Sequence, residues 1–148
     1  MYKKILVPLD GSKRAERILR HVEELALCYK SKVIFFRVFR SPMVTGYDAT
    51  ELEMFHKNCE ALLNEAQQYV DALAGEFRDK GIASSSRVAL GPVVNEILHC
   101  AERENVDLIA MSSHGRGGLS RLFYGSVASG VLNRVDRPLL VIRSRGET

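Results

Sequence analysis

The sequence predicts an α/β fold in which a single doubly wound, five-stranded parallel sheet is flanked by helices. Short continuous apolar runs alternate along the chain with segments whose apolar residues recur at helical spacing, in the order βαβαβαβαβ. The runs lack polar alternation, as is typical of strands buried on both faces. Such an order implies right-handed crossovers with helices on both faces of the sheet. At 148 residues we expect one domain, residues 1–148.

The first half of the chain is expected to hold two strands and two helices. Residues 4–9 form the first apolar run, and Ser12 is a suitable N-cap for a helix that extends to about Tyr29. Residues 32–39 are β-branched and aromatic, which favours a second buried strand. The longest predicted helix covers residues 51–80. Its apolar positions hold one helical stripe: Phe55, Cys59, Leu62, Leu63, Ala66, Tyr69, Val70, Leu73 and Phe77.

The second half adds three strands and two helices. Residues 84–90 form a weaker strand that begins with three serines, and Gly91-Pro92 opens a short helix, where proline suits the first turn. Residues 107–111 form the fourth strand. Apolar residues between 127 and 135 predict the last helix, and residues 139–142 form the final strand.

Composition excludes several classes of protein. The chain is 46% hydrophobic and 26% charged, which is typical of a soluble globular protein. No apolar run approaches the roughly 20 residues that span a bilayer, and no secretory signal is visible, so we expect a cytoplasmic protein without membrane contact. The net charge of +3 is too small to indicate nucleic-acid binding.

The three cysteines do not indicate a metal or disulfide site. Cys28, Cys59 and Cys100 are isolated, and no two of them have the short spacing of metal ligands or redox dithiols. Each falls within a predicted helix, where we expect it to pack in the core. The odd number without pairs also fits a reducing compartment.

The candidate site follows from the carboxyl ends of the predicted strands. In a doubly wound sheet the ligand crevice lies beyond these ends. They hold residues 10–12, 38–39, 90–91 and 112–118. The last of these segments contains a glycine loop that precedes a helix, and glycines and helix N-termini both favour phosphate binding. Nucleotide binding is therefore the leading hypothesis.

The glycine loop carries a resemblance to a known family. Ser112, two residues, Gly115, nine residues and then Gly125-Ser126 resemble the G-2x-G-9x-G-[ST] pattern of the ATP-binding branch of the universal stress protein family. Residues 2–12, 107–115 and 137–142 are similar to other parts of that family. The loop is neither a Walker A element nor the first turn of a dinucleotide fold. The resemblance implies a Rossmann-like fold related to adenine nucleotide alpha hydrolases.

The same resemblance implies a site for ATP, or for ADP or AMP, with Mg or Mn. The phosphates would lie at the glycine loop and the start of the last helix, with added charge from Arg116. Asp10 would lie near the nucleoside and the metal ion, and the main chain of Val38 would read the adenine edge. The residues implied in nucleotide binding are Pro8, Asp10, Val38, Gly91, Ser112, His114, Gly115, Arg116, Gly117, Gly118, Gly125, Ser126 and Val127.

Three of these residues have open alternatives. Ser112 stands where the pattern has its first glycine: a left-handed backbone there would cost about 1–2 kcal/mol, whereas a need for close approach alone would let the hydroxyl group reach the ribose or a phosphate. Asp10 also suits a helix-capping role. His114, without a serine or cysteine partner at a known catalytic spacing, also suits a structural hydrogen bond.

Two functions are considered. The first is an ATP-binding stress-response protein in which nucleotide changes the loop over residues 112–124 and so acts as a switch. The second is a dimeric interaction module that binds no nucleotide. An enzyme is not expected, because the chain lacks the S-G-G-x-D-S, H-I-G-H and K-M-S-K-S signatures of related nucleotide-activating enzymes. The apolar strand at residues 139–142 would lie at a sheet edge, and the resemblance implies a homodimer through it.

Overall fold

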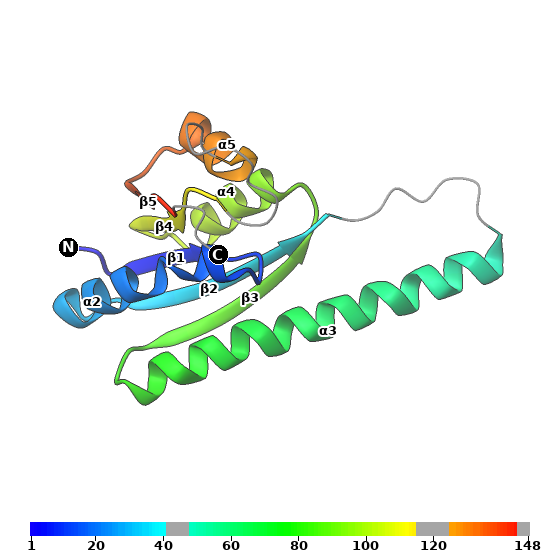
Figure 1. The fold of residues 1–148 in the computed structure, drawn as a ribbon, viewed down its shortest axis with the longest axis horizontal. Helices are drawn as coiled ribbons and strands as arrows, with labels where there is room; N and C mark the ends of the chain where they lie inside the picture. The colour runs from blue at the N-terminus through cyan, green and yellow to red at the C-terminus, as the bar shows by residue number, and fades with distance from the viewer. Residues whose placement is uncertain (41–47, 115–124, 145–148) are drawn as a thin grey trace.

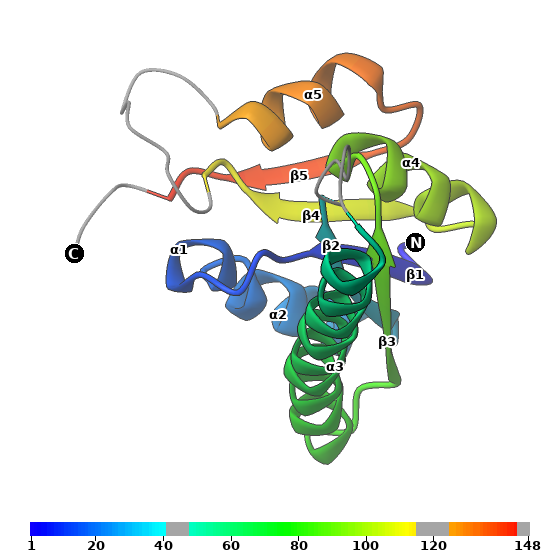
Figure 2. The ribbon, with the colours of Figure 1, turned by 90° about the vertical axis from the view of Figure 1, so that its right-hand side faces the viewer.

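A five-stranded, all-parallel sheet forms the centre of the molecule, with strand order β3-β2-β1-β4-β5 (Figures 1 and 2). The computed structural model describes residues 1–40, 48–114 and 125–144. The strands are β1 (Lys4–Pro8), β2 (Lys32–Phe39), β3 (Ser84–Leu90), β4 (Leu108–Ser112) and β5 (Leu139–Ile142). At the centre of the sheet Ile5 pairs with Val33 of β2 and with Leu108 of β4. The predicted α/β class is confirmed.

Helices cover both faces of the sheet, as Figure 2 shows. They are α1 (Lys13–Glu16), α2 (Leu19–Tyr29), α3 (Ala49–Asp79), α4 (Val93–Arg103) and α5 (Ser126–Arg134). Because successive strand residues point to opposite faces, Val33 and Phe35 pack in the core under α1–α3, while Ile34 and Phe36 pack in the core under α4 and α5. Within the described residues no helix is long and apolar enough to cross a membrane.

The helix predicted from Ser12 to Tyr29 is in fact two helices. At the break, the N–H groups of Arg17 and Ile18 donate to carbonyl oxygens three residues back, at 3.3 and 3.4 Å. Bonds of this spacing belong to a tighter 3₁₀ turn, which reorients the chain between α1 and α2. The prediction of helical residues here is confirmed, but the prediction of one continuous helix is wrong.

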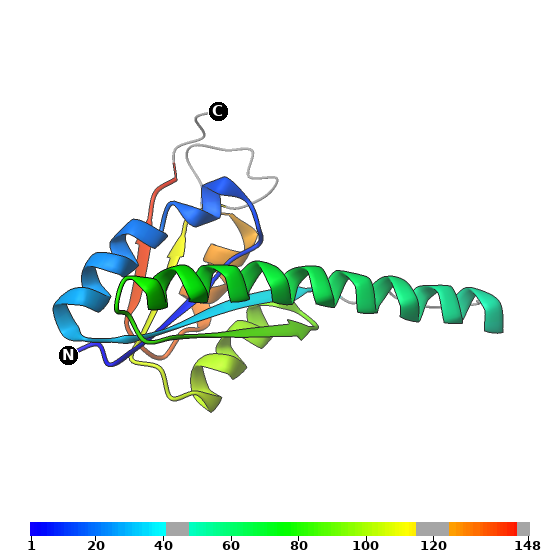
Figure 3. The same cartoon turned by 90° about the horizontal axis from the view of Figure 1, so that it is seen from below.

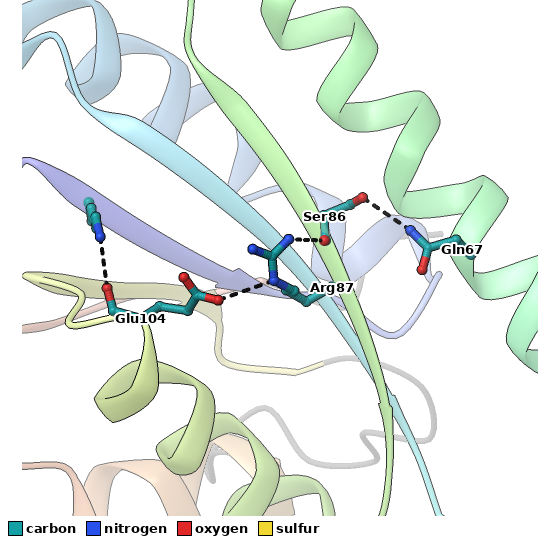
Figure 4. A network of polar contacts seen from close by, with 5 residues as sticks. Gln67, Ser86, Arg87 and Glu104 are labelled. Carbon is teal, nitrogen blue, oxygen red and sulfur yellow. Dashed lines mark hydrogen bonds and ion pairs between the residues drawn. The ribbon is translucent and has the colours of Figure 1, made fainter.

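Edge strand β3 is fixed to helices on both sides by polar contacts (Figure 4). On one face, Gln67 Nε2 of α3 donates to Ser86 Oγ at 3.1 Å. On the other, Arg87 Nε donates to Glu104 Oε1, which follows α4, at 3.1 Å. Of the three serines that weaken the strand signal in the sequence, Ser86 is the one that hydrogen-bonds to side chains of α3, those of Gln67 and Asp71.

Helix α3 begins well outside the core and only later joins it. Its start is a capping box, in which Asp48 Oδ1 accepts from Glu51 N and Glu51 Oε2 accepts from Asp48 N. The first fully buried residue is Ala66, and Figures 1 and 3 show the preceding turns projecting beyond the sheet. Near the other end the Phe77 ring meets Phe35 edge-on, with centroids 4.9 Å apart.

Burial changes along α3, and the expectation that all three cysteines pack in the core is wrong. The apolar stripe of α3 faces the core only from Ala66 onward, because Phe55, Cys59, Leu62 and Leu63 lie beyond the reach of the sheet. Of the three cysteines only Cys100 is buried. Cys28 is exposed, because α2 buries Val22 and Ala26 and turns Cys28 away from them.

Candidate functional site

The order in which the chain adds strands reverses between β1 and β4, which lie side by side in the sheet. From β1 the chain crosses to β2 and β3 through α1–α3 on one face, whereas from β4 it crosses to β5 through α5 on the other. Ligands of open α/β sheets bind beyond the carboxyl ends of strands at such a reversal. The residues that follow β1 and β4 include Asp10, Ser113 and His114.

Ser112 ends β4 and is 6% exposed, with its hydroxyl group used inside the protein. Oγ donates to the carbonyl oxygen of Ala15 in α1 at 3.0 Å. Ser112 is not among the described residues with positive φ. The left-handed strain considered from the sequence is therefore absent, and the hydroxyl group holds α1 against the end of β4 instead of pointing to a ligand.

The residues on either side of the glycine loop are tied together. Gly125 N donates to the carbonyl oxygen of Ser113 at 2.8 Å, and a Cβ atom on Gly125 would lie 3.1 Å from that oxygen. Ser144, after β5, donates from N to Ser113 Oγ at 3.2 Å and from Oγ to the carbonyl oxygen of His114 at 3.3 Å. These contacts place the first turn of α5, which carries Ser126 and Val127, beside the end of β4.

His114 lies within this junction. It is 6% exposed, and its Nδ1 lies 3.1 Å from Ser113 Oγ. The ring also borders Gly125, because a Cβ atom added there would lie 3.7 Å from His114 Cδ2. This arrangement favours the structural alternative, in which His114 supports the start of α5.

Asp10 organises the turn between β1 and α1. Its Oδ1 accepts from Ser12 N at 2.8 Å, and Ser12 Oγ in turn accepts from Ala15 N at 3.2 Å as the N-cap of α1. Asp10 thus forms an Asx turn, in which one carboxylate oxygen is used within the turn. The half-buried carboxylate lies at the carboxyl end of β1, where the resemblance places it near a nucleoside.

A charged cluster next to Asp10 was not found from the sequence. Tyr69 of α3 donates from Oη to Glu16 Oε2 at 2.9 Å, and the Arg37 guanidinium lies 4.8 Å from the Phe39 ring centroid and 5.7 Å from that of Tyr69. Burial raises the pKa of Tyr69 well above its usual range, and the bond to Glu16 and the charge of Asp10 raise it further. Arg37, a charged residue within the otherwise apolar run of β2, is the feature of the sequence that could have indicated this cluster.

At its carboxyl end β2 continues beyond the last residue of β1 with which it pairs. The β1–β2 register ends at the pair Pro8–Phe36, and Leu9 N donates to Phe36 O at 2.8 Å. Strand residues two apart direct their N–H and C=O groups to the same side. The main-chain groups of Val38 therefore face the side of β1 just beyond the last β1–β2 pair.

Gly91 follows β3 and lies on the side of β2 opposite to β1. Its N–H donates to Phe39 O at 2.8 Å, and its φ is +149°. A Cβ atom there would come within 2.8 Å of Glu96 Oε1. The backbone conformation favours glycine at this position, and a Cβ atom would also displace the flexible Glu96 side chain.

The remaining predicted site residues cannot be placed. Gly115, Arg116, Gly117 and Gly118 lie outside the described residues. In the part of the chain that the structure describes, no group of three or more histidine, cysteine, aspartate or glutamate side chains could hold a metal ion. Asp10 as a metal contact therefore has no neighbouring set of protein ligands among those residues.

Comparison with known proteins identifies similar chains over nearly the full length. Residues 1–143 match the model of the universal stress protein family. Universal stress protein MJ0577 of Methanocaldococcus jannaschii is 31% identical, with 98% of this chain and 97% of that protein covered. Its solved structure superimposes with a TM-score of 0.87 over 99% of both chains.

Two solved universal stress proteins of the same fold hold adenine nucleotides. One, in complex with cAMP, has a TM-score of 0.62 and 19% identity and covers 97% of this chain and 98% of its own. The other, from Arabidopsis thaliana with AMP bound, has a TM-score of 0.63 and 15% identity and covers 97% and 93%. At these identities the likeness shows the fold alone.

Proposed function

Because the chain belongs to the universal stress protein family, we propose that it binds an adenine nucleotide, with ATP as the preferred ligand, and acts as a nucleotide-dependent switch in the cytoplasmic stress response. The observation that carries this proposal is the junction at the carboxyl ends of β1 and β4. There the bond between Gly125 and Ser113 brings the start of α5 beside the strand end that faces Asp10.

In this proposal the described residues contact the adenine, the ribose and the phosphates in turn at the carboxyl end of the sheet. The main chain of Val38 faces the open side beyond β1, which suits an adenine edge, and the glycine at position 91 lets a ribose approach the backbone closely. Pro8 ends β1 beneath them. The N–H groups of the first α5 turn, at Ser126 and Val127, would bind phosphate oxygens, because unpaired N–H groups at a helix N-terminus attract anions.

A divalent cation would enter with the nucleotide. Mg²⁺ is commonly bound by one or two carboxylates together with phosphate oxygens and water molecules. We propose that the Asp10 carboxylate, which lies just beyond the carboxyl end of β1, contacts the Mg or Mn ion or the nucleoside. The glycine loop with Arg116 completes the phosphate site in this proposal.

The nucleotide would be held to change the conformation of the protein rather than to be consumed. Its phosphates would lie against both the loop and α5, and the loop ends are tied to Ser144 after β5 through Ser113 and His114. Occupancy would therefore change the loop and the nearby end of β5 together. We propose that this face communicates the bound state to partners.

A variant that narrows the phosphate site tests the proposal. Gly125→Ala places a methyl group 3.1 Å from Ser113 O, so the contact between Ser113 and the start of α5 must widen by a few tenths of an ångström. We expect the dissociation constant for Mg-ATP to rise by roughly tenfold or more in calorimetry. Gly75→Ala is the matched control, because its nearest contact lies 3.9 Å away. Equal ATP affinity in both variants would contradict the proposed site.

The alternative function, an interaction module without nucleotide, has one observation in its favour. Strand β5 lies at the edge of the sheet, and all four of its residues are apolar and half-buried. An apolar edge strand has unpaired main-chain groups that favour aggregation unless they are covered, and pairing with β5 of a second copy would cover them. A homodimer through β5 is compatible with both functions, so the nucleotide measurement decides between them.

A further inference from the structure

The first turns of α3 form an arm that the rest of the described structure does not cover. We call residues 49–65 the α3 arm. It projects beyond β2 and β3 in Figures 1 and 3, and no residue in it is buried. At 1.5 Å per residue the arm is about 25 Å long. Its capping box at Asp48 and Glu51 gives it a defined start.

The arm carries apolar side chains at the spacing of a coiled coil. Leu52, Phe55, Cys59 and Leu62, which we call the arm stripe, alternate at intervals of three and four residues. The same spacing continues through Ala66, Tyr69 and Leu73, where α3 packs on the sheet. One apolar stripe therefore runs along the whole helix. It packs against the sheet at the C-terminal end and is not covered by the described structure at the N-terminal end.

Exposure of the arm stripe is high for side chains of this type. Leu52 is 38% exposed and Leu62 is 44% exposed, while Phe55 and Cys59 are half-buried. Leu63 widens the stripe on one side. Apolar side chains that repeat every 3.5 residues pack between the side chains of a second helix, as in a coiled coil. A helix is therefore the partner element that the arm stripe fits.

Charge determines which kind of helix fits. The arm contains four carboxylates, Glu51, Glu53, Glu60 and Glu65, and one basic residue, Lys57, so it has a net charge of −3. The whole chain has a net charge of +3. Two arms from two copies would bring like charges together along the seam, whereas a basic helix would bring opposite charges.

We propose that the arm stripe docks a cationic amphipathic helix of a partner protein, which pairs with α3 as a short two-helix coiled coil. The apolar residues of the partner would pack between Leu52 and Leu62, and its lysines and arginines would lie along the acidic edges of the arm. The proposal is independent of nucleotide binding, because no residue of the arm belongs to the proposed nucleotide site.

Two synthetic peptides and full-length protein test this surface. Both peptides have about three heptads with leucine at the seam positions, and they differ in having lysine and arginine or else glutamate beside the seam. In fluorescence anisotropy we expect the cationic peptide to bind roughly tenfold or more tightly than the acidic one. Equal binding of the two peptides would overturn the proposal.

Variants then locate the binding. The double variant Leu52→Glu/Leu62→Glu should weaken cationic-peptide binding by roughly tenfold or more. Leu27→Glu, on α2 at a side chain that is 54% exposed, is the matched control and should bind as the unchanged protein does. The same loss in both variants, or in neither, would contradict docking at the arm. Because these positions are exposed, circular dichroism should show unchanged helix content.

A charge-reversal variant tests the role of the acidic residues separately from that of the apolar residues. Glu60→Lys/Glu65→Lys leaves the capping box and the arm stripe intact, and it should reverse the preference so that the acidic peptide binds more tightly. An unchanged preference would refute a charge-selected partner. Sedimentation of Leu52→Glu/Leu62→Glu should match that of the unchanged protein, whereas loss of a dimer would assign the stripe to a second copy and overturn the proposal.

Discussion

The hydroxyl group of Ser112 donates a 3.0 Å hydrogen bond to the main-chain carbonyl oxygen of Ala15. This bond joins the end of β4 to α1 at the place in the sheet where the order of the strands reverses. Ser112 occupies the position that is glycine in the pattern its sequence resembles. In this chain the position therefore has a structural role, and its backbone conformation does not require glycine.

Replacing Ser112 should destabilise the fold. Ser112→Ala removes the buried donor and should lower the free energy of unfolding by about 1 kcal/mol, measured by urea denaturation. Ser112→Gly loses the same bond and adds backbone entropy in a strand, so we expect a loss of about 2 kcal/mol. If Ser112→Gly instead stabilised the protein, strain at this position would be present and the structural role assigned to Ser112 would be wrong.

The pH dependence of stability should report the buried Tyr69. Its pKa in the folded protein is raised above the ordinary value of 10.0, mainly by burial. Between these two values the folded state holds a proton that the unfolded state has lost, so stability decreases as pH rises above about 10. The stabilisation from this group is complete below that pH.

The matched variant for this measurement is Tyr69→Phe, which keeps the ring and removes the ionising group. In urea denaturation at pH 8 and at pH 11, the unchanged protein should lose more stability between the two pH values than the variant does. Equal losses would show that Tyr69 does not hold its proton in the folded state, contrary to the contact with Glu16.

Much of the fold could be predicted because strand and helix patterns are local. Residues 32–39, 84–90 and 139–142 are strands with the predicted bounds. The fourth strand is shifted by one residue, from 107–111 to Leu108–Ser112, because the Asp107 carboxylate accepts from the N–H groups of Lys3 and Lys4. The ends of elements depend on such tertiary contacts, which the pattern does not contain.

The site could be predicted only as a set of strand ends. The rule for parallel sheets selects the ends of β1, β2, β3 and β4 as the candidate site, but the bond from Ser112 to Ala15 joins residues 97 positions apart. The cluster of Glu16, Arg37 and Tyr69 likewise draws on three separate elements. The periodicity of α3 shows which face of the helix is apolar, but it does not show where the sheet ends.

The edge strand β5 should control the oligomeric state. Val141→Lys places a charge on the exposed edge strand, and a charge there disfavours pairing with a second copy. We expect the unchanged protein to sediment as a dimer and the variant as a monomer. Leu132→Lys, on α5 at a side chain that is 51% exposed, serves as the control. An unchanged dimer in Val141→Lys would argue against this interface.

Nucleotide binding itself is the central claim, and calorimetry of the purified, nucleotide-stripped protein with Mg-ATP measures it most directly, with ADP and AMP as comparisons. We expect saturable binding at micromolar ATP with one nucleotide per chain, and a weaker complex for Asp10→Ala. The absence of binding up to millimolar ATP would contradict the nucleotide-switch function and leave the dimeric interaction module as the function of this chain.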